Sequence, residues 1–265
     1  MIYETLLVDK EAGVATITLN RPEVINAFNE ALGREFMQAI EAVAQDNEVR
    51  AVVIKGAGRG FSSGADVRRF MQAVEARRRG ERVVGMGSML RGRGPLAMRD
   101  MAKPIIASIH GPCVGLGFTV ALACDIRIAA DDAQFGAIFT RVGLMPEFGS
   151  TYTLPRLVGV AKAMELCLTG RIFGAQEALA IGFVNKVVPV ASMEKETMEM
   201  ARQIASGPPL AMGLIKRLLY QGLDCDLAAQ YHAEALGIQT LFESEDHAEG
   251  VTAFLEKRAP VFKGS

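Results

Sequence analysis

Two glycine-bearing loops carry backbone N–H groups that could bind an anion or stabilise a developing negative charge. They are K-G-A-G-R-G-F-S-S-G-A-D, Lys55 to Asp66, and H-G-P-C-V-G-L-G-F-T, His110 to Thr119. Each loop follows a predicted buried strand and precedes a predicted helix, where N–H groups commonly point outward toward anions. Tight turns that need positive φ would explain the same glycines. The residues alone leave both explanations open.

Several other catalytic patterns are missing from the sequence. It contains no H-E-x-x-H, G-x-x-x-x-G-K-[ST] or G-x-S-x-G motif, which argues against a zinc protease, a P-loop enzyme and a serine hydrolase. Gly115 and Gly117 make a poor dinucleotide fingerprint, because Val120 stands where the third glycine belongs. His110 adjoins one of the loops, but a histidine after a buried strand is expected to be structural. We expect no metal and no separate cofactor.

Apolar patterning predicts strand-strand-helix cycles in the first part of the chain. The runs Thr5 to Val8 and Val14 to Leu19 predict a hairpin around the turn Glu11-Ala12-Gly13. Helical spacing after the cap Asn29 leads into a buried strand, Ala51 to Ile54. A second cycle contains strands at Ile105 to Ile109, Ile126 to Ala129 and Gln134 to Gly136, and a helix from about Gly117 to Cys124. The pattern predicts an α/β fold with a loose repeat.

The rear of the chain is predicted to be mostly helical. Pro208 and Pro209 suit the first turn of a new helix. The helix that follows has an apolar stripe made of Leu227, Tyr231, Ile238, Leu241 and Phe242. We therefore divide the chain into a core, residues 1–205, and a C-terminal helical region, residues 206–265, whose stripe a partner subunit could cover.

Charge and cysteine usage limit the expected partners and location. The formal net charge of −1 gives no overall field to attract nucleic acid or an anionic membrane. No segment approaches the roughly 20 apolar residues of a membrane span. The four cysteines are far apart with no C-x-x-C spacing, so neither a disulfide framework nor a zinc site is indicated. We expect a cytoplasmic protein that binds neither nucleic acid nor a membrane.

The stretch Arg68 to Arg99 is rich in arginine and raises the question of RNA binding. It holds nine arginines but only two glutamates. Phe70 is its only aromatic residue, which gives single-stranded bases little to stack on. We expect a solvated helix face with one or two arginines near a ligand's phosphates.

Ordered motifs run along nearly the whole chain. They are R-P-E-V-I-N-A-F-N at Arg21, F-S-S-G-A-D-V at Phe61, K-P-I-I-A-S-I-H-G-P-C-V-G-L-G at Lys103, A-Q-F-G at Ala133 and A-L-A-I-G-F-V-N-K-V-V-P at Ala178. Together they resemble the crotonase family, also called the enoyl-CoA hydratase/isomerase superfamily. The resemblance implies a spiral of ββα repeats, a C-terminal helical trimerisation region and a homotrimer or hexamer. It also implies an acyl-CoA substrate, with coenzyme A as part of that substrate.

The resemblance assigns roles to particular residues. The N–H groups of Ser63 and Leu116 would bind the thioester oxygen, where preorganised donors are worth roughly 3 to 4 kcal/mol each. Coenzyme A would contact Val24, Ala27, Ala65, Asp66 and Val67. Phe254 and Lys257 would reach coenzyme A, often that of a neighbouring subunit.

The chain departs from the family's hydratases at both of their glutamate positions. Thr119 and Phe139 stand there, and neither side chain can act as a carboxylate base. Water addition needs one group to accept a proton from water and another to deliver one to carbon. P-E-F-G-S-T-Y-T-L-P, from Pro146, resembles the isomerase branch and offers Glu147 as a single acid/base. Burial among Phe139, Leu144, Met145 and Phe148 would raise its pKa.

We therefore expect an enoyl-CoA isomerase that shifts a double bond with Glu147. An enoyl-CoA hydratase that uses Glu147 and a bound water is the alternative. A noncatalytic coenzyme A-binding or RNA-binding member of the family is a third possibility, from a different functional class.

Overall fold

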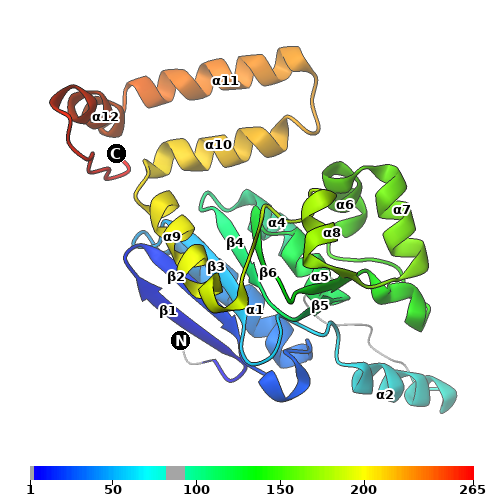
Figure 1. Cartoon of the computed structure of the whole chain (residues 1–265). Helices are drawn as coiled ribbons and strands as arrows, with labels where there is room; N and C mark the ends of the chain where they lie inside the picture. Colours follow the sequence, from blue (N-terminus) through cyan, green and yellow to red (C-terminus); the bar gives the residue numbers. More distant parts are fainter. Residues whose placement is uncertain (1–2, 82–92) are drawn as a thin grey trace.

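The computed structural model describes residues 3–81 and 93–265 and shows an α/β core followed by helices (Figure 1). Among these residues, six strands form a sheet in the order β1-β2-β3-β4-β6-β9, and three form a second sheet, β5-β7-β8. β1 and β2 are antiparallel, whereas the other neighbours in the first sheet are parallel. The predicted α/β class is confirmed.

The elements have the following bounds. The strands are β1 (Leu6–Glu11), β2 (Val14–Leu19), β3 (Ala51–Gly56), β4 (Ile105–Ile109), β5 (Pro112–Val114), β6 (Ile126–Ala130), β7 (Gln134–Gly136), β8 (Phe173–Gly174) and β9 (Lys186–Val188). The helices of the core are α1 (Glu30–Gln45), α2 (Val67–Arg78), α4 (Gly94–Asp100), α5 (Leu116–Leu122), α6 (Ser150–Val158), α7 (Val160–Thr169), α8 (Ala175–Ala180) and α9 (Met193–Ala205). The C-terminal helices are α10 (Pro209–Gln221), α11 (Leu227–Phe242) and α12 (Glu245–Glu256), and short 3-10 helices lie at Pro22–Val24, Ile138–Val142 and Val190–Ser192.

The central strand β3 is buried on both faces, as its continuous apolar run predicts. Successive side chains of a strand point to opposite faces. Val52 and Ile54 accordingly join the core cluster that contains Phe36 of α1. Val53 joins the cluster that contains Ala201 of α9. The sheet is therefore covered by α1 on one face and by α9 on the other.

The first hairpin differs slightly from the prediction. β1 continues to Glu11, which pairs with Val14, so the turn consists only of Ala12 and Gly13. Both turn residues have positive φ, 49° and 77°, and such two-residue turns match the twist of a hairpin.

The C-terminal helices extend away from the sheet (Figure 1). α10 is fixed to the core by the buried Lys216, whose ammonium lies 2.7 Å from Asp125 and donates to the carbonyls of Met98 at 2.9 Å and Lys103 at 3.1 Å. Large apolar side chains of α10 to α12 are nevertheless exposed, among them Leu219, Leu227, Tyr231 and Phe254. None of the helices in residues 3–81 and 93–265 has the length and apolar character needed to cross a membrane.

A buried asparagine joins the turn after β2 to the first glycine-bearing loop. Asn26 is fully buried, and its side-chain nitrogen donates to the carbonyls of Ala57 and Gly60 at 2.9 Å and Phe61 at 3.1 Å. Its side-chain oxygen accepts from the N–H of Arg21 at 2.9 Å. Asn26 also has a φ of 52°, which asparagine tolerates better than most residues. This one side chain holds two loops together.

We predict that Asn26→Ala lowers the free energy of unfolding by about 2–4 kcal/mol, because it leaves several buried backbone groups unpaired. Urea unfolding followed by circular dichroism measures this change. Asn29→Ala is the matched control, since Asn29 accepts a single capping bond from the N–H of Leu32. That control should lose only about 1 kcal/mol. Equal losses in the two variants would contradict the linking role of Asn26.

Candidate active site

The two glycine-bearing loops meet through a short parallel bridge. The N–H of Ser62 donates to the carbonyl of Pro112 at 2.9 Å, and the N–H of Val114 donates to that of Ser62 at 3.0 Å. Gly117 in α5 makes this approach possible, because a Cβ there would lie 2.6 Å from the Cβ of Ser62. The first loop therefore packs directly against the start of α5.

A second bridge sets the direction of the Ala65 N–H. Phe28 donates to the carbonyl of Gly64 at 2.7 Å and accepts from the N–H of Asp66 at 3.0 Å. Backbone groups alternate along an extended segment, so the N–H of the intervening Ala65 points away from Phe28. No group in the described part of the chain accepts a hydrogen bond from it.

Leu116 supplies a second free N–H close to the first. It is the first residue of α5, where backbone N–H groups have no partner within the helix. Among the described residues no other acceptor bonds it. A Cβ built on Gly64 would lie 3.3 Å from the nitrogen of Leu116, which places this N–H beside the Gly64-Ala65 segment. Ala65 and Leu116 thus form a pair of candidate donors.

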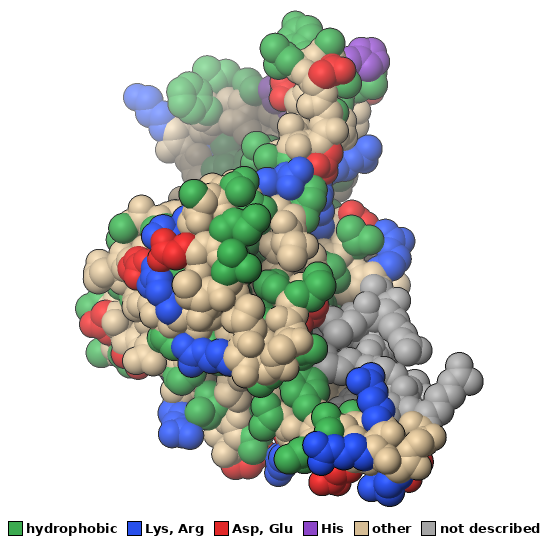
Figure 2. All heavy atoms as spheres, turned by 90° about the vertical axis from the view of Figure 1, so that its right-hand side faces the viewer, with side chains coloured by type: hydrophobic (Ala, Val, Ile, Leu, Met, Phe, Trp, Pro, Cys, Tyr) green, Lys and Arg blue, Asp and Glu red, His purple; other side chains and the backbone are tan. Residues whose placement is uncertain are grey.

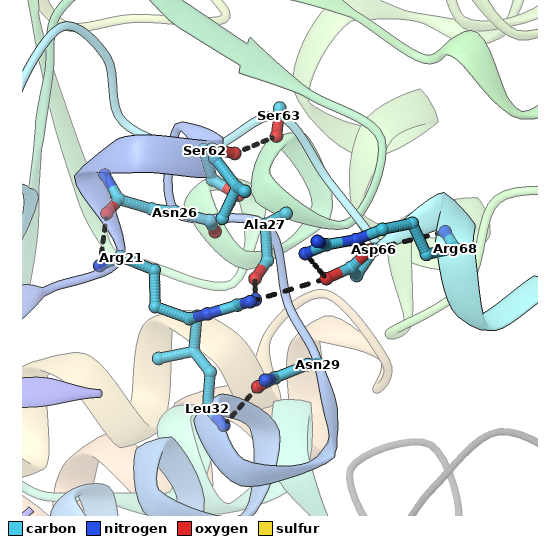
Figure 3. A network of polar contacts seen from close by, with 10 residues as sticks. Arg21, Asn26, Ala27, Asn29, Leu32, Ser62, Ser63, Asp66 and Arg68 are labelled. Atoms are coloured by element: carbon cyan, nitrogen blue, oxygen red, sulfur yellow. Dashed lines mark hydrogen bonds and ion pairs between the residues drawn. The ribbon is translucent and has the colours of Figure 1, made fainter. Parts of the chain in front are cut away.

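The prediction that Ser63 supplies one of the donors is wrong. Its N–H already donates to the carbonyl of Ile25 at 2.8 Å. Its hydroxyl donates to the carbonyl of Val24 at 2.9 Å. Figure 3 shows Ser62 and Ser63 above the turn that carries Asn26. Because backbone directions alternate along this loop, the N–H without a partner in the described part of the chain is that of Ala65 rather than that of Ser63.

Glu147 lies in the segment that leads from the 3-10 helix at Ile138–Val142 into α6. Its carbonyl accepts from the N–H of Ser150 at 3.1 Å and from the Ser150 hydroxyl at 2.6 Å, which fixes the backbone at the start of α6. Its Oε1 accepts from the Thr119 hydroxyl at 3.2 Å. The predicted base therefore lies against α5, the helix that begins at Leu116.

Burial raises the pKa of Glu147 to about 7, and the hydrogen bond from Thr119 opposes that rise. Of the four apolar neighbours expected around Glu147, Phe139 and Phe148 are buried. Leu144 and Met145 are exposed, so the expectation that they shield the carboxyl is wrong. The direction of the pKa shift agrees with the prediction, but the apolar cover comes from fewer residues.

Of the residues expected to contact coenzyme A, Ala27 and Asp66 lie close together around Arg21 (Figure 3). The carbonyl of Ala27 accepts from the Arg21 guanidinium, which also lies 3.4 Å from Asp66. The carboxylate of Asp66 also bonds Arg68 at 2.8 Å, and chiefly this bond holds its pKa at about 2. Val67 is exposed at the start of α2. Arg21 was not singled out from the sequence, although it opens the R-P-E-V-I-N-A motif.

Two other predicted contact residues lie elsewhere in this chain. Phe254 belongs to α12, and Lys257 follows that helix with a φ of 57°. Figure 1 places α12 and α2 at opposite ends of the molecule. The Phe254 side chain is 83% exposed. Within one chain, therefore, neither residue joins the loops at Ala65 and Leu116.

The arginine-rich stretch is only partly described, because residues 82–92 lie outside the described residues. Figure 2 shows Lys and Arg side chains gathered around α2. Several of the described arginines pair with carboxylates of the same chain, including Arg79 with Glu81 at 2.7 Å and Arg93 with Asp100 at 2.7 Å. The expectation of a solvated helix face stays a prediction.

His110 has the structural contact expected of it. Its Nε2 lies 2.8 Å from the carbonyl of Gly58, across the first loop. The described residues also bring together no group of three His, Cys, Asp or Glu side chains that could hold a metal ion.

Comparison with known proteins gives the family. A family model described as enoyl-CoA hydratase/isomerase matches residues 9–265. The chain belongs to this family. It is 37% identical to a short-chain-enoyl-CoA hydratase of Clostridium acetobutylicum over 97% of each chain. It is 36% identical to the 1,2-epoxyphenylacetyl-CoA isomerase of Escherichia coli, over 99% of this chain and 100% of the isomerase.

Solved structures of the enoyl-CoA hydratase/isomerase family share the fold. An enoyl-CoA hydratase from Bacillus anthracis superposes with a TM-score of 0.90 at 35% identity, covering 99% of this chain and 100% of that one. The crotonase-like architecture and the family resemblance proposed from the motifs are both confirmed.

The raised pKa of Glu147 predicts how stability depends on pH. Its folded pKa of about 7 lies above its ordinary value of 4.5, so protonation favours the folded state. This stabilisation is fully present below the ordinary value and is lost as pH rises through about 7. Between pH 5 and 8, the wild type should lose about 1–2 kcal/mol relative to Glu147→Gln, a figure discounted for the water that still reaches the carboxyl.

Urea unfolding of both proteins across this pH range measures the difference. Glu48→Gln, which alters a highly exposed carboxylate, is the control and should follow the wild type. A difference between wild type and Glu147→Gln that does not change with pH would contradict the raised pKa.

Proposed function

We propose that this protein is an enoyl-CoA isomerase that moves a double bond with Glu147 as its single acid/base. The observation that carries the proposal is the contact between Glu147 and Thr119, at 3.2 Å, on the helix that begins with a free N–H. A carboxyl whose pKa is about 7 can both accept and return a proton near neutral pH.

The proposed reaction begins with a 3-enoyl-CoA. Glu147 removes a proton from C2, and the electron pair moves toward the thioester oxygen. The N–H groups of Ala65 and Leu116 stabilise the negative charge that develops there, at roughly 3 to 4 kcal/mol for each donor. Glu147 then returns the proton to C4, and the double bond lies between C2 and C3.

The lack of a carboxylate at the two positions expected for the hydratase glutamates supports isomerisation over hydration. Thr119 and Phe139 occupy the positions where the family resemblance implies the hydratase glutamates. Thr119 is fully buried and Phe139 nearly so. Neither a threonine nor a phenylalanine side chain can act as a general base at these positions. A proton shuttle between two carbons needs only one such group, whereas addition of water needs two proton transfers to different partners.

Binding of coenzyme A is proposed to use two surfaces. Val24, Ala27, Ala65, Asp66 and Val67 form the first, with coenzyme A as part of the substrate and no separate cofactor. Phe254 and Lys257 form the second, from a neighbouring subunit, because α12 lies far from the site of its own chain. We propose a homotrimer or hexamer on this ground and because the C-terminal helices expose large apolar side chains. A cytoplasmic location is part of the proposal.

A hydratase is the second candidate. The relatives from Clostridium acetobutylicum and Rhodobacter capsulatus are named as a hydratase and a probable hydratase, and the latter is 39% identical to this chain. For such an activity, Glu147 and a bound water would have to replace two carboxylates.

Activity assays separate the two candidates. We predict that the purified protein converts 3-enoyl-CoA to the conjugated 2-enoyl-CoA, monitored by ultraviolet absorbance, and adds water slowly or not at all to 2-enoyl-CoA. Glu147→Gln should lower kcat for isomerisation by about 10²- to 10⁴-fold, the usual contribution of a general acid/base. Glu48→Gln should keep the wild-type rate. Fast hydration that survives in Glu147→Gln would overturn the isomerase proposal.

A further inference from the structure

Thr119 lies between the candidate base and the helix that supplies one candidate donor. Its hydroxyl oxygen is 3.2 Å from Oε1 of Glu147 and 3.0 Å from the carbonyl oxygen of Leu116. The residue is fully buried in the middle of α5. The sequence marked Thr119 only as a position that lacks a carboxylate, and the family comparison assigns it no role.

A threonine hydroxyl has one proton, so it can donate fully to only one of these two oxygens at a time. We propose that Thr119 is a positioning residue that donates its proton to Oε1 while Glu147 is ionised and to the Leu116 carbonyl once Glu147 is protonated. This inference rests on the proposed function of Glu147 as the acid/base.

The arrangement gives the two carboxyl oxygens different roles. Oε1 is held by Thr119, whereas Oε2 has no hydrogen-bond partner among the described residues. The substrate proton would therefore move from C2 to Oε2, and the same proton would leave Oε2 for C4. The Thr119 proton only changes its acceptor during these steps and is never transferred.

Thr119 also shifts the protonation equilibrium of Glu147 toward the ionised form. A hydrogen bond donated to a carboxylate favours the ionised form, so Thr119 limits the rise in pKa that burial produces. Without it, a smaller fraction of Glu147 would be ionised at neutral pH and able to accept the C2 proton.

On the elements around Glu147, the charged side chains are either exposed or paired with other residues. α5 has no titratable side chain, and Arg141 on the preceding 3-10 helix is exposed. On α6, Arg156 lies 3.8 Å from Asp224, and Tyr152 donates to the same carboxylate. On α4, Arg93 pairs with Asp100 and Arg99 with Asp224, each at 2.7 Å. Thr119 is therefore the polar side chain that bonds Glu147 within the described residues.

Infrared titration of the carboxyl band tests this inference without using enzymatic activity. The band of protonated Glu147 is identified by its loss in Glu147→Gln. Thr119→Val keeps the side-chain shape but removes the hydroxyl, and it should raise the pKa of Glu147 by about one unit, the size expected for a lost bond to a charged group. Thr119→Ser should keep the wild-type value. Thr119→Cys, whose S–H is a weak donor, should lie between them and serves if the valine variant fails to fold.

Thr153→Val is the matched control, because the Thr153 hydroxyl donates to the nearby Gly149 carbonyl at 3.1 Å. It should leave the pKa of Glu147 unchanged. An unchanged pKa in Thr119→Val and Thr119→Cys would overturn the role of Thr119.

Kinetics separate this inference from the proposed function. If the protein is an isomerase, Thr119→Val should lower kcat at neutral pH by about fivefold with little change in KM, and the loss should shrink at higher pH. Thr119→Ser should restore kcat. If the wild type fails to isomerise, the proposed function is wrong, yet the infrared titration still decides whether Thr119 controls the ionisation of Glu147.

Discussion

The buried side chain of Asn26 is the contact on which the geometry of this site depends. It links the turn after β2 to the loop that follows β3, and the backbone carbonyl of Asn26 accepts from the Ser62 hydroxyl at 2.9 Å. With that turn fixed, Phe28 can bridge to Ala65 and turn one N–H away from the packed backbone. The bridge between Ser62 and Cys113 then brings the loop against α5. A single fully bonded amide thus sets the relative position of the two candidate donors.

Most polar groups around this site have hydrogen-bond partners among the described residues, and a few have none. The described part of the chain has no buried side-chain nitrogen or oxygen without a partner, so the scaffold around the site is fully bonded. Among the polar groups without a partner in the described part of the chain are the N–H groups of Ala65 and Leu116 and Oε2 of Glu147. Free donors beside a carboxyl whose pKa lies near neutrality are suited to a reaction in which negative charge moves from a base to a thioester oxygen.

The sequence predicted the order of elements and the two loops, because these depend on local patterns. The role of Glu147 came from the family resemblance and stays a prediction. Apolar runs indicated β3 and β4, and the cap at Asn29 indicated the start of α1. It did not predict that Ala65 rather than Ser63 has the free N–H, since that depends on pairing with Phe28, which is distant in sequence. The contact between Thr119 and Glu147 joins residues 28 positions apart, and the exposure of Met145 likewise depends on how the chain turns before α6.

Isotope transfer tests most directly whether one carboxyl performs both proton steps. A 3-enoyl-CoA that carries deuterium at C2 is converted by the wild-type protein in ordinary water, and the product is analysed by NMR and mass spectrometry. A shuttle through Glu147 predicts 2-enoyl-CoA in which part of the deuterium has moved from C2 to C4. Product without deuterium at C4, together with 3-hydroxyacyl-CoA, would contradict a single-carboxyl isomerase.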